Sequence, residues 1–177
     1  MGIKWYNTYM RYIWYYDSPV GKILMIASEN AVTGIYFENQ RYFPENIQDS
    51  CIEQETVILH KCTQWLQKYF QGDCSIFPYP LDPKGTQFQK RIWNILMEIP
   101  YGSTWSYAEV CARYCALYNV KTMSNQAVGS AIGHNPVSIL IPCHRVIGSN
   151  GKLTGYAGGL DRKKYLLELE KNNQFYE

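Results

Sequence analysis

The spacing of apolar positions changes along the chain. In residues 12–37, three short runs rich in aromatic and β-branched residues are separated by turn-forming residues, and the runs cover 12–16, 22–27 and 32–37. This pattern is typical of an antiparallel meander of strands. A helix is expected next, from about residue 53 to 70, because apolar side chains recur there at helical spacing: Ile58, Cys62, Trp65, Leu66, Tyr69 and Phe70.

The rest of the chain is mostly helical in pattern. One amphipathic helix should end before Pro100, since apolar residues recur at i, i+4, i+7, i+8 and i+11 from Phe88 to Ile99. Residues 106–109 read Ser-Tyr-Ala-Glu, which is a capping box that opens a second helix. Ser124 can cap a third helix, rich in small residues and ending at Gly133, and a last helix is expected over about 160–171. Helix, turn, helix is the predicted arrangement.

A linker separates the two patterns. Pro78, Pro80, Pro83 and Gly85 break regular structure between them. We therefore predict an α+β protein in which residues 1–83 form a small amino-terminal α/β domain with its linker, and residues 84–177 form a second, mostly helical domain.

Composition narrows the class of protein. With 46% hydrophobic residues in 177 the chain should form a globular core, and no run approaches the roughly 18 apolar residues of a membrane span. The amino terminus lacks the pattern of a signal peptide. We therefore expect a cytoplasmic protein with no membrane partner. The six cysteines should be reduced, and no set of ligands suggests a metal. No cofactor is expected.

Charge is distributed unevenly. Residues 1–83 hold six Lys and Arg against nine Asp and Glu, whereas residues 84–171 hold eleven against five. A solvated helix face could produce such a bias. Together with the predicted helix-turn-helix, however, the basic second part indicates a surface that meets phosphates.

The candidate chemistry lies at Pro142-Cys143-His144-Arg145. The apolar run 137–141 should be a buried strand that Pro142 ends, and the thiol and imidazole that follow supply a sulfur nucleophile and a base. A buried, inert thiol is the alternative for Cys143. Glu170 shares a helix face with Leu166 and Leu167, so its carboxylate should point inward and need a partner, for which His144 is the candidate.

These residues and their flanks resemble the O6-alkylguanine-DNA alkyltransferases. The resemblance rests on the Pro-Cys-His-Arg-Val core, on Gly133-His134-Asn135-Pro136 before it and on the glycine-rich stretch 150–160 after it, and it extends over about 87–170. It implies a ribonuclease-H-like first domain and a winged helix-turn-helix-like second domain. It further implies irreversible transfer of an alkyl group from an extruded O6-alkylguanine in double-stranded DNA to Cys143, and it leaves O4-alkylthymine open as a further substrate.

The resemblance also implies roles for single residues. Cys143, His144 and Glu170 would be catalytic, and Asn135 would tie the helix-turn-helix to the active-site segment. Base and DNA contacts would come from the following residues: Tyr107, Gln126, Ala127, Ser138, the Val146 carbonyl, Tyr156 and Ala157. Gln126 departs from the family pattern, which has an arginine at this position, so a weaker salt-dependent part of the affinity is expected. Arg145 is expected to form an ion pair within the domain.

Two other classes remain open. A cysteine hydrolase would use the same Cys-His-carboxylate series with an oxyanion hole and would turn over repeatedly. A winged-helix DNA-binding regulator would need no reactive thiol. We expect a monomer, and cooperative binding along DNA is an open alternative.

Overall fold

The computed structural model describes residues 10–173, and its first part is a four-stranded sheet in the order β3-β2-β1-β4. β1 (Tyr12–Ser18), β2 (Gly21–Ala27) and β3 (Val32–Phe37) form the predicted antiparallel meander. After a short 3-10 helix, η1 (Ile47–Ser50), the two-residue β4 (Ile52–Glu53) pairs in parallel with β1.

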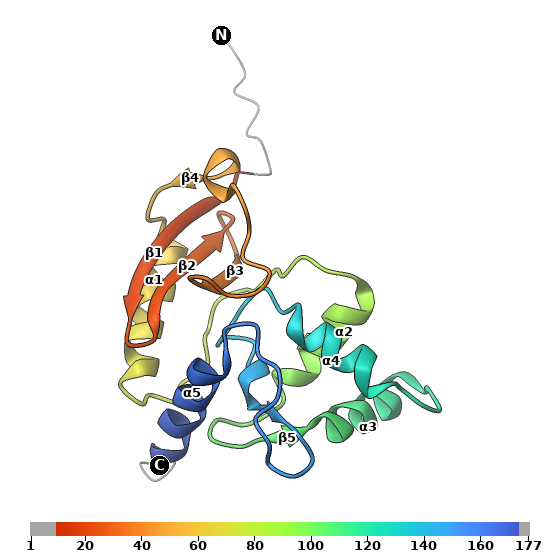
Figure 1. Cartoon of the computed structure of the whole chain (residues 1–177). Helices are drawn as coiled ribbons and strands as arrows, with labels where there is room; N and C mark the ends of the chain where they lie inside the picture. The colour runs from red at the N-terminus through yellow and green to blue at the C-terminus, as the bar shows by residue number, and fades with distance from the viewer. Residues whose placement is uncertain (1–9, 174–177) are drawn as a thin grey trace.

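One helix, α1 (Val57–Phe70), packs against this sheet and lies behind it in Figure 1. Its buried face includes Leu59, Cys62 and Leu66, which belong to the same apolar cluster as the sheet residues. The predicted start near residue 53 is wrong. Residues 52–53 pair with β1, and the helix begins only after Thr56, whose side chain accepts a hydrogen bond from the Leu59 N–H.

The second part contains the helix-turn-helix. α2 (Gln87–Leu96), α3 (Tyr107–Tyr118) and α4 (Asn125–Gly133) pack against one another, and the capping box that opens α3 is present. α2 ends at Leu96, three residues earlier than the pattern predicted, although Ile99 is still buried. A two-stranded parallel pair, β5 (Trp105–Ser106) with β6 (Val146–Ile147), completes this part. None of the helices within residues 10–173 is long and apolar enough to cross a membrane.

The segment 137–141 is not the buried strand that the sequence predicted. Only Val137 forms a bridge with the sheet, opposite Ile35, and the chain then turns, with Ile139 in the left-handed region at φ 70°. Asn135 explains the turn. Its side chain accepts from the Val137 N–H at 2.9 Å and donates to the Ile141 carbonyl at 2.9 Å, so it takes up backbone groups that a strand would pair.

The last helix, α5 (Leu160–Asn172), lies below the sheet in Figure 1, and its Glu170 contacts both Tyr69 of the first part and His144 of the second. Arg162 at its start donates to the carbonyls of Val20 and Glu38 in the first part and of Gly158 in the second. The buried apolar cluster is likewise continuous across both parts. The division of the chain into two domains near residue 83 stays a prediction.

Candidate active site

Cys143 begins the 3-10 turn η2 (Cys143–Arg145), directly after Pro142. The residue is only 5% exposed, and its Sγ lies 3.1 Å from the Nδ2 atom of Asn135. Asn135 itself is buried. The amide that folds the 135–141 turn therefore also contacts the sulfur, and a single side chain sets the position of the thiol.

The resting thiol is protonated. Burial raises the pKa of Cys143 above its ordinary value, and the Asn135 hydrogen bond offsets this only in part. A thiol attacks as its thiolate. The site must therefore supply a base when the nucleophile reacts.

His144 has the properties of that base. Its Nε2 lies 2.7 Å from Oε1 of Glu170, and since a carboxylate only accepts, Nε2 carries the hydrogen. Nδ1 is then the basic nitrogen. It is buried and forms no hydrogen bond within residues 10–173. Burial lowers the pKa of His144 below its ordinary value, against the influence of Glu170, so the ring is neutral at pH 7.

Glu170 is fully buried and surrounded by donors, as its predicted inward orientation requires. Arg145 donates to both of its oxygens, at 2.8 and 3.0 Å, which confirms the expected internal ion pair of that arginine. Tyr69 and the Gly102 N–H add hydrogen bonds at 2.7 and 3.0 Å. Burial alone would raise the pKa of Glu170, but the hydrogen bonds from His144 and Arg145 and the positive charge of Arg145 hold it well below its usual value.

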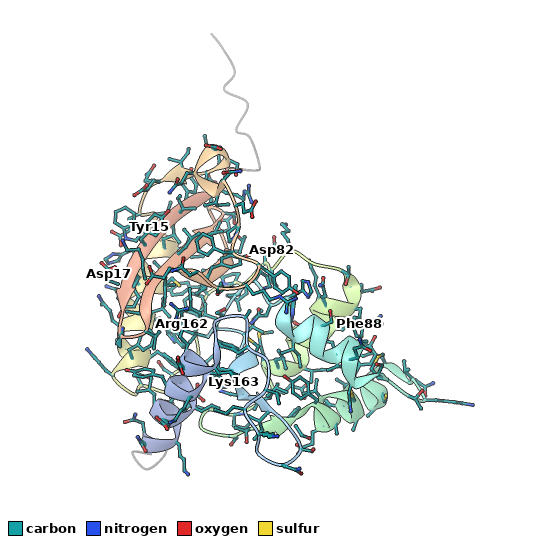
Figure 2. All side chains as sticks on the ribbon, viewed as in Figure 1. Tyr15, Asp17, Asp82, Phe88, Arg162 and Lys163 are labelled. Carbon is teal, nitrogen blue, oxygen red and sulfur yellow. The ribbon has the colours of Figure 1, made fainter. Side chains whose placement is uncertain are left out.

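A second buried cation lies nearby. Lys163 is fully buried, and its Nζ donates to the carbonyls of Val146 at 2.6 Å and Thr154 at 2.7 Å (labelled in Figure 2). Burial lowers its pKa to about 8. Because Val146 follows the Cys143 turn and Thr154 lies in the loop before α5, Lys163 ties these two segments together.

A cavity of about 810 Å³ opens beside this centre. Its walls come from the start of α3, from α4, from the loop 148–159 before α5, which we call the glycine-rich loop, and from the loop after β3. The cavity is large enough for a nucleobase, because small-molecule sites commonly enclose 300–1,000 Å³.

The structure brings together most of the predicted base and DNA residues. Tyr107, Gln126, Tyr156 and Ala157 line the cavity. Tyr107 packs beside Gly129 of α4, where an added Cβ would lie 3.5 Å from its ring, so the small residues of α4 let the tyrosine sit close to the helix. The lining does not include Cys143, Val146, Ser138 or Ala127. Val146 and Ser138 are buried.

Four residues of this region were not predicted from the sequence. Tyr69, Lys163, Arg41 and Tyr42 contact the centre or line the cavity. A signal existed for Lys163, which is three positions before Leu166 and seven before Glu170 and so shares their inward helix face. Arg41 and Tyr42 follow the first sheet, and only the three-dimensional fold places them here.

Some of the positive charges that make the second part basic are bound to acceptors inside the protein. Arg145 and Lys163 are tied to buried acceptors, and Arg162 bonds backbone carbonyls. These three cations stabilise the protein and are not available to phosphates, so the charge count alone overstates the basic surface.

The comparisons with known proteins agree with this centre. Residues 87–172 match the family model of the 6-O-methylguanine DNA methyltransferase DNA-binding domain, and residues 10–83 match that of its ribonuclease-like domain. The chain is 43% identical over 155 residues to a methylated-DNA–protein-cysteine methyltransferase of Methanosarcina acetivorans, covering 88% of this chain and 95% of the relative. A relative of the same name from Haemophilus influenzae is 41% identical over 161 residues, with 90% and 86% covered.

Solved structures give the same result. The O6-methylguanine methyltransferase of Mycobacterium tuberculosis matches with a TM-score of 0.81 and 38% identity, covering 95% of this chain and 97% of that one. A Mycobacterium tuberculosis structure described as a complex with DNA matches with a TM-score of 0.79 and 37% identity, with 93% and 94% covered. The fold and the similar proteins thus place this chain in the class of DNA alkyltransferases. The chain belongs to the 6-O-methylguanine DNA methyltransferase family.

Proposed function

We propose that this protein repairs DNA by moving an alkyl group from O6 of a guanine to Sγ of Cys143. The observation that carries the proposal is the buried hydrogen bond between His144 and Glu170, next to Cys143 in the chain, which leaves the Nδ1 atom of His144 unpaired within the described residues. The names of the relatives and the DNA-bound structure of one of them support the substrate class.

The chemistry balances without a cofactor. His144 accepts the thiol proton, directly or through one water, and the thiolate attacks the alkyl carbon. The new bond is Sγ–C, and the bond that breaks is C–O6. The guanine regains its N1–H, so the thiol proton ends on the base. Asn135 holds the sulfur in place, and Glu170 holds the imidazole in the reactive tautomer.

The reaction stops after one turnover. The product is a thioether, in which sulfur is a very poor leaving group, so no group of the site can restore the thiol. A cysteine hydrolase, in contrast, passes through a thioester that water cleaves. Irreversible consumption therefore distinguishes the two classes.

The base must leave the duplex to reach a buried sulfur, at a cost of a few kcal/mol. We propose that the cavity receives it, with Tyr107 and Tyr156 against the base and the Ala157 N–H toward O6. Gln126 would fill the vacated stack, with Ala127 beside it against the DNA. The Val146 carbonyl would accept a hydrogen bond from the exocyclic amine of the guanine, and Ser138 would limit the width of the base pocket. Action as a monomer and a cytoplasmic location are parts of the same proposal.

Stoichiometry tests the proposal. Protein is incubated with a tenfold excess of duplex DNA carrying a radiolabelled methyl on O6 of one guanine. We expect protein-bound label to level off at one methyl per chain. Release of label from the protein, or loss of methyl from the DNA beyond one equivalent, would favour a hydrolase. Specific DNA binding without any methyl transfer would favour the alternative of a winged-helix DNA-binding regulator.

A further inference from the structure

We propose that Arg41, in the first part of the chain, binds a backbone phosphate of the DNA next to the extruded nucleotide. This inference rests on the proposed function and adds to it a DNA contact that lies outside the helix-turn-helix. It concerns the loop after β3, which forms one wall of the cavity.

The first observation is the charge of the cavity. Among the described residues that line it, Arg41 is the only one with a formally charged side chain. Gln126 at the start of α4 is neutral. A nucleotide that enters the cavity carries its phosphates to the rim, and Arg41 is the lining cation that can meet them.

The second observation is that this charge is not already paired. Arg41 is exposed, and within residues 10–173 no carboxylate lies within 4.0 Å of its guanidinium. Arg145 and Arg162, in contrast, are occupied by Glu170 and by backbone carbonyls. An exposed guanidinium without an acid partner keeps its five N–H donors for a ligand, and their fork matches the oxygens of a phosphate.

The third observation is that the side chain is held in place. The Arg41 guanidinium lies 4.8 Å from the centre of the Tyr42 ring, and this ring stacks on His134 at 4.1 Å with an angle of 25°. His134 follows α4 and is fixed by a 2.7 Å hydrogen bond from Nδ1 to the Ser130 carbonyl. We call Arg41, Tyr42 and His134 the Arg41 stack. It joins the loop after β3 to the end of α4.

The backbone of the same loop is fixed as well. The Arg41 N–H donates to the Ala157 carbonyl at 2.9 Å, so the loop after β3 is tied to the glycine-rich loop before α5 (Figure 1). Tyr42 adopts a left-handed conformation at φ 62°, which is unusual for a bulky residue. Such strain persists only where surrounding contacts impose it and is concentrated at functional sites.

The salt dependence of DNA binding tests the inference. All measurements use the full chain in a Cys143→Ala background, which cannot react, and a duplex carrying one O6-methylguanine. Arg41→Gln should reduce the magnitude of the slope of log K against log salt concentration by about 0.9, the value for one lost phosphate contact. Between 50 and 200 mM salt the affinity should then fall about 3.5-fold less than without the change.

Two variants serve as controls. Arg41→Lys keeps the charge and should keep the slope. Lys61→Gln removes an exposed cation on α1, which does not line the cavity, and should leave the slope unchanged. An Arg41→Gln slope equal to that of Lys61→Gln would overturn the inference. Failure of methyl transfer by the wild-type protein would instead overturn the proposed function, so the two failures are distinguishable.

Discussion

Glu170 and His144 form a fully buried hydrogen-bonded pair, in which Oε1 of the carboxylate accepts from Nε2 of the ring at 2.7 Å. The pair does not consist of two full charges. Arg145 already neutralises Glu170, and burial lowers the pKa of His144. The carboxylate therefore orients a neutral imidazole and leaves Nδ1 as its basic atom, which is the state a general base needs before reaction.

Replacement of the base should slow the reaction and change its pH dependence. His144→Gln can still donate to Glu170 but has no basic nitrogen, so the single-turnover rate at pH 7.5 should fall about 10²- to 10⁴-fold. Because burial raises the pKa of Cys143, the residual rate should keep rising with pH as more thiolate forms. Rapid-quench kinetics from pH 6 to 10 measure both effects. His60→Gln, at an exposed site, should behave as wild type, and a wild-type rate in His144→Gln would exclude its role as base.

Glu170 should make the fold sensitive to acid. Its folded pKa lies below the unfolded value of about 4.3, so its contribution to stability is present above that pH and is lost as pH falls below it. Urea unfolding at pH 7 should show Glu170→Gln to be less stable by about 3–5 kcal/mol, because Arg145 loses its buried partner. The difference from wild type should shrink between pH 5 and 3. Glu168→Gln, two positions away and exposed, should change neither value. A difference that is constant with pH would contradict this account.

Lys163 should make the stability of the fold depend on pH in the alkaline range. Burial lowers its pKa to about 8, below the unfolded value of about 10.4, so folding releases a proton between these pH values. The stability of wild type relative to Lys163→Met should therefore rise as pH increases from about 8 toward 10. Guanidinium unfolding of both proteins at several pH values measures this difference and cancels contributions from cysteines and tyrosines. The exposed neighbour change Lys164→Met should show no such trend.

Asn135 should be needed for both stability and activity. Asn135→Ala leaves the buried Val137 N–H without its partner, which costs about 1–3 kcal/mol, and removes one of two donors to the Ile141 carbonyl, which keeps the Cys143 N–H. It also removes the amide beside the sulfur. We expect a lower unfolding free energy and slower methyl transfer, whereas Asn150→Ala in the exposed loop should affect neither. Unchanged stability would show that the turn does not depend on this side chain.

Local patterns predicted most of the fold, and distant contacts account for what they missed. The β3 bounds and the caps of α3 and α4 follow from nearby residues, and so does the inward face of Glu170. The 137–141 segment was misread because its apolar run resembles a strand, whereas the Asn135 side chain competes for the same backbone groups.

For the site as well, the sequence predicted what depends on neighbouring residues and missed the distant contacts. The neighbours of Glu170 on its own helix predicted that its side chain points inward. Its partners Tyr69 and Gly102, however, are 101 and 68 positions away in the sequence. Arg41 reaches the cavity because the loop after β3 bonds the glycine-rich loop and stacks on His134 after α4. Neither contact leaves a periodic signal in the sequence.

The most direct test of the central claim is the intact mass of the protein after incubation with duplex DNA containing O6-methylguanine, followed by peptide mapping. We predict a gain of about 14 Da, located on Cys143, in the wild type, because the thiolate is the strong nucleophile of the site. Cys143→Ala and wild type given undamaged DNA should show no gain. An unchanged wild-type mass, or a methyl group on another residue, would contradict the account.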